Sequence, residues 1–437
     1  MKFRITTLGC KVNQYESEAI SKELETSKWK PVQIQEHADL CIVNTCTVTQ
    51  KASMQSRQAV RQAIRANPGA RIVVTGCYAQ TAAEEISSIQ GVDDVIGHAD
   101  KHNIASMFRS FEENKNTHPN SICSNVLDEH QFKQFSETVY GTRTRPFMKI
   151  QDGCESFCTY CIVPLARGPS RSMPLTDVLE HIKQLGSVGY HEVVLTGVHL
   201  GHYGLDLTPK ANLYDLLCRI DASNSIERVR LSSIEPLELN NDIIECTATS
   251  RRFCRHFHIP LQSGDNGILK KMQRPYTRNY FHDLVFKIHK RLPDAAVGAD
   301  ILVGFPGETH EAFENTYNLI QASPIAYLHV FPFSARPGTP ASKFADKVPS
   351  DVIKKRCGRM RRLGTEKKVR FYKKFTGQTL EVLIEETRDK KSGLLKGFSS
   401  NYIPVLVDAS DEHMNTIVQV KIQNLTRNNF LLGTIQI

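Results

Sequence analysis

The stretch DGCESFCTYC, residues 152–161, carries three cysteines in the spacing C-x3-C-x2-C. They are Cys154, Cys158 and Cys161, and they follow an apolar run (146–151) that predicts a β-strand. Three thiolates from one short loop are typical ligands of a [4Fe–4S] cluster, whose fourth iron then has no protein ligand. Such an open metal position can bind a substrate or cofactor. Structural zinc is the alternative, but zinc prefers four ligands and no fourth partner lies nearby in the sequence.

The cysteine run stands near the start of a long series of alternating strands and helices. Amphipathic stretches such as 172–189 and 280–292 separate six apolar β-type runs, at 146–151, 192–198, 228–234, 256–262, 298–305 and 326–333. Strands that alternate with helices form parallel sheets. The series predicts a partial parallel (βα)6 barrel over residues 141–375, with functional residues at the carboxyl ends of its strands.

The same alternation occurs in residues 1–110, which we expect to form a separate α/β domain. Four apolar runs predict strands there, at 3–10, 39–46, 71–77 and 93–100. This pattern favours a doubly wound parallel sheet.

Three cysteines of this first domain lie just past predicted strands. They are Cys10, Cys46 and Cys77, in the contexts LGC, NTC and TGC. Because the carboxyl ends of parallel strands share one edge of a sheet, these cysteines can converge in space although they are far apart in sequence. Three thiolates again indicate a cluster with one open iron. The alternative is that they are buried small hydrophobic residues.

The remaining segments differ in character from the two α/β domains. Residues 111–140 are polar, lack a clear period and are predicted to be a linker. From residue 376 to 437, short β-type runs at 379–386, 402–409, 417–425 and 430–437 are broken by turn residues. These runs predict a small β-barrel.

The charge of the chain is concentrated in one segment. The whole chain has a formal net charge of +9, and residues 341–375 alone hold 13 Lys/Arg against 3 Asp/Glu. The pattern excludes a uniformly cationic, histone-like chain and suggests one localised site for a polyanion. The segment is a predicted helix with Ile353, Cys357, Met360 and Gly364 along one face. The alternative is an ordinary solvated charged helix.

The composition and the absence of several known motifs exclude further classes of protein and enzyme. Twelve cysteines in 437 residues are too few for a disulfide scaffold. The N-terminus lacks the apolar region of a signal peptide and no apolar run approaches a membrane span, so we expect a cytoplasmic protein with no membrane partner. No P-loop, H-E-x-x-H or G-x-S-x-G motif occurs, which leaves P-loop nucleotide hydrolysis, zincin and α/β-hydrolase chemistry unsupported.

Taken together, these motifs resemble a known enzyme family. C-x3-C-x2-C after the first strand of a partial barrel is similar to the radical S-adenosylmethionine enzymes. With the three N-terminal cysteines and the terminal β-barrel, the whole chain resembles their methylthiotransferase family. The matching motifs are LGCKVNQYESE (8–18), VNTCTVT (43–49), TGCYAQ (75–80), DGCESFCTYCIVPLARG (152–168), HIPLQSGD (258–265), DILVGFPGET (300–309) and FSARPGTPA (333–341).

Within that family, the sequence resembles the branch that acts on N6-threonylcarbamoyladenosine beside the tRNA anticodon. Two motifs carry this resemblance: Gly76-Cys77-Tyr78-Ala79-Gln80, and Lys11-Val12-Asn13 after Cys10. The isopentenyladenosine branch tends to read Gln-Met-Asn there, and the branch that modifies a ribosomal-protein aspartate tends to read Pro-Lys-Asn. Isopentenyladenosine tRNA is therefore an alternative substrate, and a non-catalytic iron–sulfur RNA-binding protein is an alternative of a different class.

The resemblance also implies cofactors and partners. Cys154, Cys158 and Cys161 would hold the cluster that binds S-adenosylmethionine and cleaves it to a 5′-deoxyadenosyl radical, which abstracts hydrogen from C2 of the adenine at position 37. The N-terminal cysteines would hold an auxiliary [4Fe–4S] cluster that presents sulfur, and a second S-adenosylmethionine would supply the methyl group. An external electron donor and a sulfur source are the implied partners besides tRNA.

Further positions are assigned singly from the same resemblance. Thr196, Gly197, Gln262 and Asp300 resemble the positions that line the cofactor side. The tail from residue 376 is similar to the RNA-binding module called TRAM.

Several polar and aromatic residues admit more than one interpretation. Arg167 and Arg171 follow the cysteine loop, where cations can meet carboxylates or phosphates. Met173 stands where the family often has a second arginine, so any contact of that arginine is not carried over. We expect five histidines to be structural rather than metal ligands: His199, His202, His256, His258 and His329. In the tail, two aromatic residues either stack on bases or fill the barrel: Phe398 and Tyr402.

Overall fold

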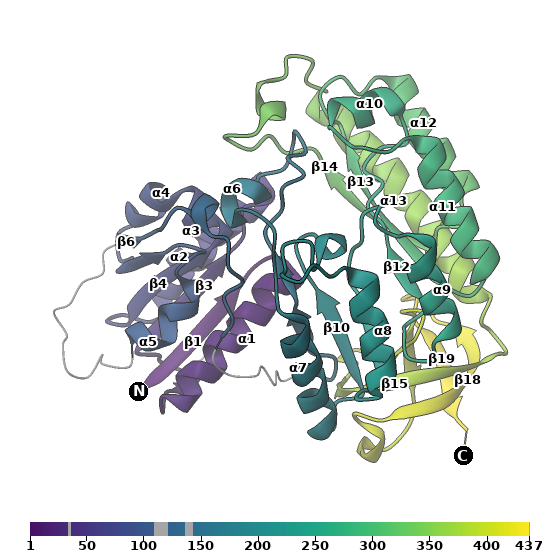
Figure 1. Ribbon diagram of the computed structural model, residues 1–437, viewed down its shortest axis with the longest axis horizontal. Coiled ribbons are helices and arrows are strands. Elements are labelled where there is room, and N and C mark those ends of the chain that lie inside the picture. The colour runs from purple at the N-terminus through teal and green to yellow at the C-terminus, as the bar shows by residue number, and fades with distance from the viewer. Residues whose placement is uncertain (34–35, 109–120, 136–142, 437) are drawn as a thin grey trace.

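The computed structural model describes residues 1–33, 36–108, 121–135 and 143–436. Figure 1 shows an N-terminal α/β domain beside a larger α/β domain, with a β-barrel below the latter. The fold class predicted from the sequence is confirmed in all three parts. No helix among the described residues is long and apolar enough to cross a membrane.

The N-terminal domain is built on a six-stranded parallel sheet in the order β2-β1-β3-β4-β5-β6. Its strands are β1 (Lys2–Thr7), β2 (Lys30–Pro31), β3 (Leu40–Thr45), β4 (Arg71–Gly76), β5 (Asp94–Ile96) and β6 (Ser121–Ile122). Its helices are α1 (Lys11–Thr26), α2 (Gln50–Ala66), α3 (Cys77–Thr81), α4 (Ala83–Ser87) and α5 (Ile104–Met107).

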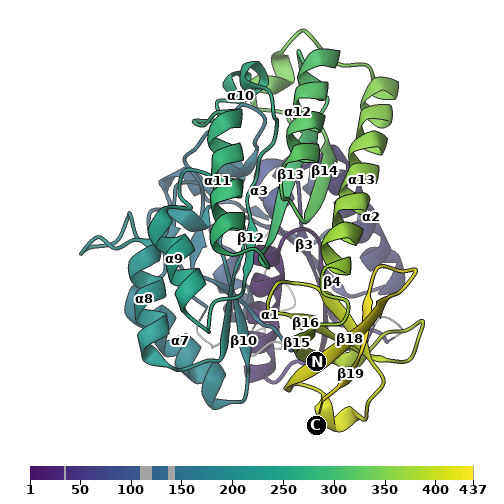
Figure 2. The same cartoon turned by 90° about the vertical axis from the view of Figure 1, so that its right-hand side faces the viewer.

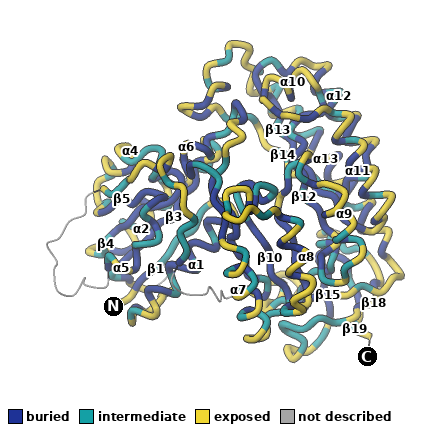
Figure 3. Tube along the Cα trace, viewed as in Figure 1, coloured by how far each residue is buried: buried dark blue, intermediate teal, exposed yellow. Residues whose placement is uncertain are grey.

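Helices cover both faces of this sheet, so it is doubly wound, and the side chains of each strand point to the two faces in turn. Leu40 and Ile42 of β3 pack toward α1 and α5, while Cys41 and Val43 pack toward α2, α3 and α4. Figure 3 shows β3 and β4 as a buried layer beneath these helices. Helix α1 leads from β1 to β2 in one direction along the sheet, and α2 leads from β3 to β4 in the opposite direction, so the winding direction changes between β1 and β3. Ligands bind at such switch points in open α/β sheets.

The central domain is a partial barrel of two three-stranded parallel sheets. Its strands are β7 (Phe147–Lys149), β10 (Glu192–Thr196), β11 (Arg228–Leu231), β12 (His256–His258), β13 (Ala296–Val303) and β14 (Tyr327–Pro332). Isolated parallel bridges, Val229 to Phe253 and Ser233 to His258, join the two sheets into one curved wall. No pairing within the described ranges joins β7 to β14, so the barrel is open on that side. Helix α1 packs beside β7 at this opening.

Helices cover the outside of the barrel (Figure 2). They are α7 (Leu175–Ser187), α8 (Leu213–Ser223), α9 (Asn241–Thr249), α10 (Asn266–Lys271), α11 (Arg278–Arg291) and α12 (His310–Ala322). Local capping explains where several begin, since the side chains of Asn212, Thr277 and Thr309 accept backbone N–H groups at the starts of α8, α11 and α12. Apolar residues on the inner faces of these helices and the outer face of the strands form one continuous core.

The basic segment forms α13 (Ser350–Lys373), which packs against β14. Cys357, Met360 and Gly364 are buried along one face, as the sequence predicts. Arg356 and Arg359 pair with Glu308 and Glu314 of the barrel. Other cations of the helix and its end remain exposed: Lys354, Lys355, Arg361, Arg362, Arg370, Lys373 and Lys374.

The C-terminal residues form a closed barrel in the order β15-β16-β17-β19-β18. The strands are β15 (Thr379–Arg388), β16 (Leu395–Ser399), β17 (Pro404–Val407), β18 (Ile417–Leu425) and β19 (Leu431–Ile435). The prediction of a small β-barrel is thus confirmed, although the sequence analysis did not identify β16.

The predicted linker 111–140 is described only in part, because residues 111–120 and 136–140 lie outside the described ranges. Residues 121–122 form β6 at the edge of the N-terminal sheet, and Phe135 packs edge-on against Tyr15 with 6.4 Å between ring centroids. The described part of this segment therefore packs with the N-terminal domain and also contacts the central one, where Gln134 donates to Asp177.

Candidate active site

The three N-terminal cysteines lie together at one edge of the doubly wound sheet. Cys10 follows β1, Cys46 follows β3 and Cys77 follows β4. Gly9 has φ +101°, and a Cβ there would lie 2.9 Å from Sγ of Cys46, so only glycine lets these two segments approach so closely. Burial raises the pKa of Cys46 to about 12, and the nearby thiols of Cys77 and Cys10 also raise it. The convergence expected from the sequence is what the structure shows.

The second set of cysteines lies in the loop between β8 (Gln151–Asp152) and α6 (Val163–Arg167). Cys154 N–H donates to the carbonyl of Gly168 at 3.0 Å, and Cys161 N–H donates to the carbonyl of Cys158 at 2.9 Å. Burial raises the pKa of Cys161 to about 12, with further contributions from the thiols of Cys158 and Cys154. The loop thus holds three close thiols at the carboxyl end of the first barrel strand.

The spacing of the sulfur atoms separates the two metal alternatives. Among the described residues, three groups of possible ligands have all their ligand atoms within 4.8 Å of one another, and none of these groups contains a cysteine. A single tetrahedral zinc ion needs Zn–S bonds of about 2.3 Å and hence closer sulfurs. Two sets of three thiolate donors that are near one another but more widely spaced fit a multi-iron cluster better than zinc.

A histidine and a glutamate support the loop of the second set. His199 Nδ1 lies 3.3 Å from Sγ of Cys154 and 3.1 Å from Oγ of Ser156. Its Nε2 is hydrogen-bonded to Glu238. Although burial opposes its charge, the contacts with Cys154 and Glu238 raise the pKa of His199 to about 9. The sequence predicts a structural role for His199 and carries no signal for this contact, because the three segments involved are far apart in the chain.

An arginine missed by the sequence analysis lies on the other side of the same loop. Arg274 Nη1 donates to Sγ of Cys158 at 3.3 Å, and its Nε donates to the hydroxyl of Tyr276 at 3.0 Å. Its Nη2 is paired with Glu235. Hydrogen bonds to ligand sulfurs are one of the ways in which proteins tune iron–sulfur clusters.

Arg167 connects the two sets of cysteines through a buried ionic network. Its guanidinium donates to Asp152 at 2.8 Å, two residues before Cys154. It also donates to Glu16 at 3.1 Å and to Asn13 at 2.6 Å, both on α1 directly after Cys10. Arg167 is 2 % exposed, and its charge lowers the pKa of the Cys46 and Cys77 thiols, against the larger effect of their burial.

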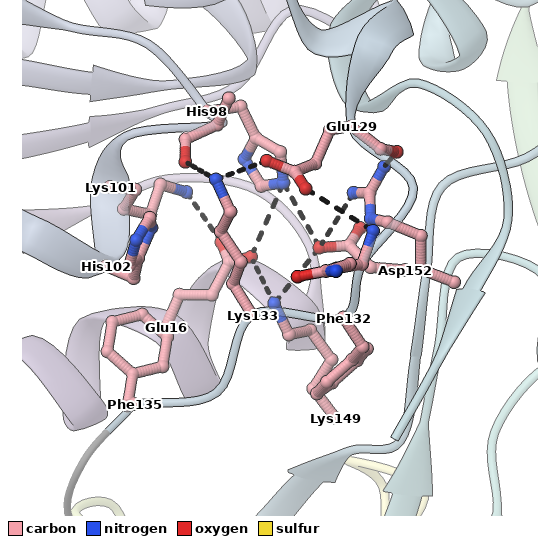
Figure 4. Close-up of a pocket in the computed structure, with 13 residues that line it drawn as sticks. Glu16, His98, Lys101, His102, Glu129, Phe132, Lys133, Phe135, Lys149 and Asp152 are labelled. Carbon is pink, nitrogen blue, oxygen red and sulfur yellow. Dashed lines mark hydrogen bonds and ion pairs between the residues drawn. The ribbon is translucent and has the colours of Figure 1, made fainter. Parts of the chain in front are cut away.

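Lysines complete this network, as Figure 4 shows. Lys101 Nζ lies 2.6 Å from Glu16, and Lys149 Nζ lies 3.2 Å from Glu16 and 3.0 Å from Asp152. Although burial alone would raise it, the pKa of Asp152 is held well below its usual range by Lys149 and Arg167. Both carboxylates are therefore ionised at the junction of the two domains.

The four predicted cofactor-side residues lie on three barrel segments: Thr196 and Gly197 at the end of β10, Gln262 after β12, and Asp300 within β13. Thr196 is buried at the end of β10, and a Cβ at Gly197 would lie 2.8 Å from Oε1 of Gln151. Gln262 has φ +64°, and its N–H donates to the carbonyl of Asp300 at 2.8 Å. Their contact with a cofactor stays a prediction.

Asp300 and two of the five histidines form a cluster inside the barrel. The carboxylate lies 2.8 Å from Nε2 of His258 and 3.2 Å from Nδ1 of His329. These hydrogen bonds lower the pKa of Asp300, against the effect of burial.

Arg171 and Met173, which follow the cysteine loop, both point into the protein. Arg171 donates to the backbone carbonyls of Glu129, Pro169 and Arg167 rather than to a free anion site. Met173 is fully buried in the apolar core of the barrel.

The two tail aromatics do not fill the C-terminal barrel. Phe398 and Tyr402 are stacked 5.3 Å apart outside its core. The guanidinium of Arg145 lies 4.1 Å from the Phe398 ring, and that of Arg230 lies 4.9 Å from the Tyr402 ring. These aromatic residues therefore attach the C-terminal barrel to the lower end of the central one.

Comparison with known proteins agrees with this architecture. Residues 2–97 match the family model described as "Uncharacterized protein family UPF0004", and residues 148–320 match the Radical SAM superfamily. The chain is 39% identical over 419 residues to the threonylcarbamoyladenosine tRNA methylthiotransferase MtaB of Bacillus subtilis, covering 95% of this chain and 92% of that protein. The chain belongs to the radical SAM tRNA methylthiotransferases.

Other relatives of this methylthiotransferase carry two different names. The MtaB protein of Aquifex aeolicus is 37% identical, with 89% of this chain and 94% of that protein covered. A tRNA-2-methylthio-N(6)-dimethylallyladenosine synthase of Clostridium botulinum is 36% identical, with 99% and 96% covered. Among solved structures, the radical S-adenosylmethionine methyltransferase TsrM of Kitasatospora setae shares the fold, with a TM-score of 0.57, 16% identity and coverage of 78% and 76%.

Proposed function

We propose that this methylthiotransferase adds a methylthio group to C2 of N6-threonylcarbamoyladenosine at position 37 of tRNA. The observation that carries the proposal is the 39% identity, over 95% of the chain, to a relative named for that substrate. The proposal is supported by two sets of three cysteines, one in each α/β domain, that flank the buried guanidinium of Arg167. Such an arrangement suits a reaction in which a radical formed at one site meets sulfur held at the other.

The cofactors of this proposal are two [4Fe–4S] clusters and S-adenosylmethionine. Cys154, Cys158 and Cys161 would hold one cluster, and Cys10, Cys46 and Cys77 would hold the other. When bound, these groups supply one-electron chemistry, sulfur and the methyl group, and the protein supplies orientation and exclusion of water.

The described residues have separate tasks in this proposal. Arg274 and His199 orient the sulfurs of Cys158 and Cys154 by direct contact. Arg167 fixes the distance between the two domains, and Thr196, Gly197, Gln262 and Asp300 remain candidates for S-adenosylmethionine contact. An external electron donor, a sulfur source and tRNA would be the partners, in the cytoplasm.

The decisive experiment is nucleoside mass spectrometry of tRNA from a strain that lacks the gene. The 2-methylthio derivative of N6-threonylcarbamoyladenosine should vanish, and a plasmid copy should restore it. A copy with Cys154→Ala should fail to restore it, while one with the exposed Cys218→Ala should succeed. Persistence of this nucleoside in the deletion strain would contradict the proposal.

The second candidate substrate is isopentenyladenosine tRNA, which is favoured by the 36% identity to the Clostridium botulinum synthase. The same experiment separates the two, because the methylthio derivative of isopentenyladenosine would vanish instead. A purely RNA-binding protein would form no 5′-deoxyadenosine from S-adenosylmethionine and reductant when both clusters are fully loaded.

A further inference from the structure

A cavity of about 440 Å³ lies where all three domains meet. One wall comes from Lys11 of the N-terminal domain, and others come from Phe147, Val194 and Arg230 of the central barrel. The C-terminal barrel closes it with Tyr402 and with Glu385, Glu386 and Thr387, and the segment before β7 adds Arg143, Thr144 and Arg145. Its size is that of a small-molecule pocket.

The arginines of this cavity are already paired. Arg143 Nε lies 2.6 Å from Glu18, Arg145 Nη2 lies 2.8 Å from Glu385, and Arg230 Nε lies 2.7 Å from Glu192. These pairs neutralise the arginines and fix the walls of the cavity.

Lys11 differs from the arginines. Among the described residues, no carboxylate lies within 4.0 Å of its Nζ, and no hydrogen-bond acceptor is found for it. Its ammonium lies 5.9 Å from the centroid of the Phe147 ring. A half-buried ammonium without an anion is costly, because its desolvation is not compensated. Lys11 is therefore the cation of this lining without an ion pair, while the carboxylate of Glu386 at the exposed rim of the lining accepts a hydrogen bond from Asn415.

The position of Lys11 beside Cys10 indicates which anion it can bind. Lys11 is the first residue of α1, and Cys10 of the proposed auxiliary site immediately precedes it. The amide groups that open a helix add positive potential at the same place. Phe147 begins the strand that leads to Lys149, which is ion-paired with Asp152, two residues before Cys154. An anion held by Lys11 would thus lie next to the segment that carries Cys10.

We propose that Lys11 binds the threonyl carboxylate of the substrate nucleoside and thereby selects threonylcarbamoyladenosine over adenosines with an apolar N6 substituent. The inference rests on the proposed function, since it assumes a nucleoside whose C2 faces the N-terminal cysteines. The threonylcarbamoyl group extends from N6 and carries the carboxylate at its far end, many bonds from C2, a span that can reach the residue after Cys10. A dimethylallyl group has no charge and would leave the ammonium unpaired, which penalises the wrong substrate.

A backbone phosphate is the other anion that an RNA ligand could offer. Lys11 lies in a walled cavity between three domains, whereas the exposed cations of α13 lie on an open helix face. The cavity has room for the N6 substituent of a nucleoside whose C2 faces the cysteines beyond this lining, and the phosphates are better met by the open face. The experiment distinguishes the two anions.

The test measures equilibrium binding of short anticodon stem-loops to the full-length protein loaded with both clusters, without S-adenosylmethionine. One RNA carries threonylcarbamoyladenosine, and a second carries its neutral carboxamide analogue. Each is bound to the wild type, Lys11→Met, Lys11→Arg and Lys30→Met, the last of which removes an equal charge from an exposed position of the same domain. Iron content and kcat/KM are measured on the same samples.

The wild type should bind the acid about 10- to 100-fold more tightly than the carboxamide, as expected for one charge-assisted hydrogen bond. Lys11→Met should abolish that difference, Lys11→Arg should keep most of it, and Lys30→Met should leave it unchanged. The loss on Lys11→Met should appear mainly in KM.

Two results would overturn the inference. One is equal binding of acid and carboxamide by the wild type, which needs no variant and so does not depend on the folding of Lys11→Met. The other is equal weakening of both RNAs by Lys11→Met, which would assign the ammonium to a phosphate. Failure of the proposed function is a separate result, in which the wild type methylthiolates neither RNA although it cleaves S-adenosylmethionine.

Discussion

Arg167 donates a hydrogen bond of 2.6 Å from Nη2 to the side-chain oxygen of Asn13, which lies 154 positions earlier in the chain. Asn13 in turn donates to the carbonyls of Leu8 and Thr45, on the segments that lead to Cys10 and Cys46. One guanidinium thus links the cysteine loop of the central domain to the backbone around the N-terminal cysteines.

Replacing this guanidinium should destabilise the protein strongly. Arg167→Met leaves the buried carboxylates of Glu16 and Asp152 without one of their cations, and removal of one partner from a buried ion pair costs about 3–5 kcal/mol. Denaturant unfolding measures the change in the free energy of unfolding. The matched exposed variant Arg65→Met should change it by less than about 0.5 kcal/mol. A similar small change for Arg167→Met would show that the network is not a structural link.

Removing the donor to Cys158 should change the electron affinity of the cluster proposed there. Arg274→Gln removes a positive N–H donor at 3.3 Å from the sulfur, and such donors stabilise the reduced, more negative state. We therefore expect a lower reduction potential, measured by a redox titration followed by electron paramagnetic resonance. Lys270→Gln, at an exposed position four residues away, is the control and should leave the potential unchanged.

Loss of one N-terminal cysteine should remove one of the two proposed clusters and leave the other in place. Cys10→Ala should remove about half of the iron and sulfide, because one of two equal clusters then has only two protein ligands. Cleavage of S-adenosylmethionine should persist while methylthio transfer stops. Cys218→Ala, at an exposed cysteine outside both sets, should retain all of the iron. Full iron content in the Cys10 variant would argue against the auxiliary site.

The exposed cations of α13 should contribute to tRNA affinity by neutralising phosphates. In Arg361→Gln/Arg362→Gln, the slope of log Kd against log salt should become shallower by about 1 for each phosphate that the protein no longer neutralises. Filter binding over a range of salt concentrations measures the slope. Lys28→Gln/Lys30→Gln, which removes two exposed cations of the N-terminal domain, should keep the wild-type slope.

Acid should lower the free energy of unfolding through Glu192 of the central barrel. Although burial opposes it, Arg230 and Arg228 lower the pKa of Glu192 to about 2, below the value near 4.3 of an unfolded glutamate. The depressed pKa stabilises the fold above about pH 4.3, and this contribution, about 3 kcal/mol, is lost as the pH falls toward 2. Unfolding free energies at pH 6 and pH 3 should differ less in Glu192→Gln than in the wild type. Equal pH dependence in both proteins would contradict the assignment.

The parts of the fold that the sequence predicts well are those with a local period. The strands that precede Cys10, Cys46 and Cys77 are continuous apolar runs, and the carboxyl-end rule for parallel sheets brings their cysteines together without further information. Strand β16 was missed because it is short and contains Gly397, which is needed where the strand crosses Val382 and Leu383. A Cβ at that position would clash with both.

Contacts between distant elements carry no such local signal. His199 and Arg274 each reach the site from a separate loop, and nothing in their sequence neighbourhood distinguishes a contact with cysteine from a surface position. Arg167 meets carboxylates, one of the two anions expected after the cysteine loop, but its distant partner Glu16 has no signal in the sequence. Phe398 and Tyr402 were expected either to bind bases or to fill their own barrel. They pack instead under Arg145 and Arg230, because the adjacent domain offers cations that a single-domain pattern cannot reveal.

The attachment of Phe398 and Tyr402 also changes the role of the C-terminal barrel. Arg230 donates to the carbonyls of Ser399 and Ser400, so backbone and rings of one loop are held together at the base of the central barrel. A module fixed in this way is joined to the central barrel by contacts of its own and not by the chain alone. The residues that it adds to the cavity, Glu385 and Tyr402, therefore keep their place relative to Arg230.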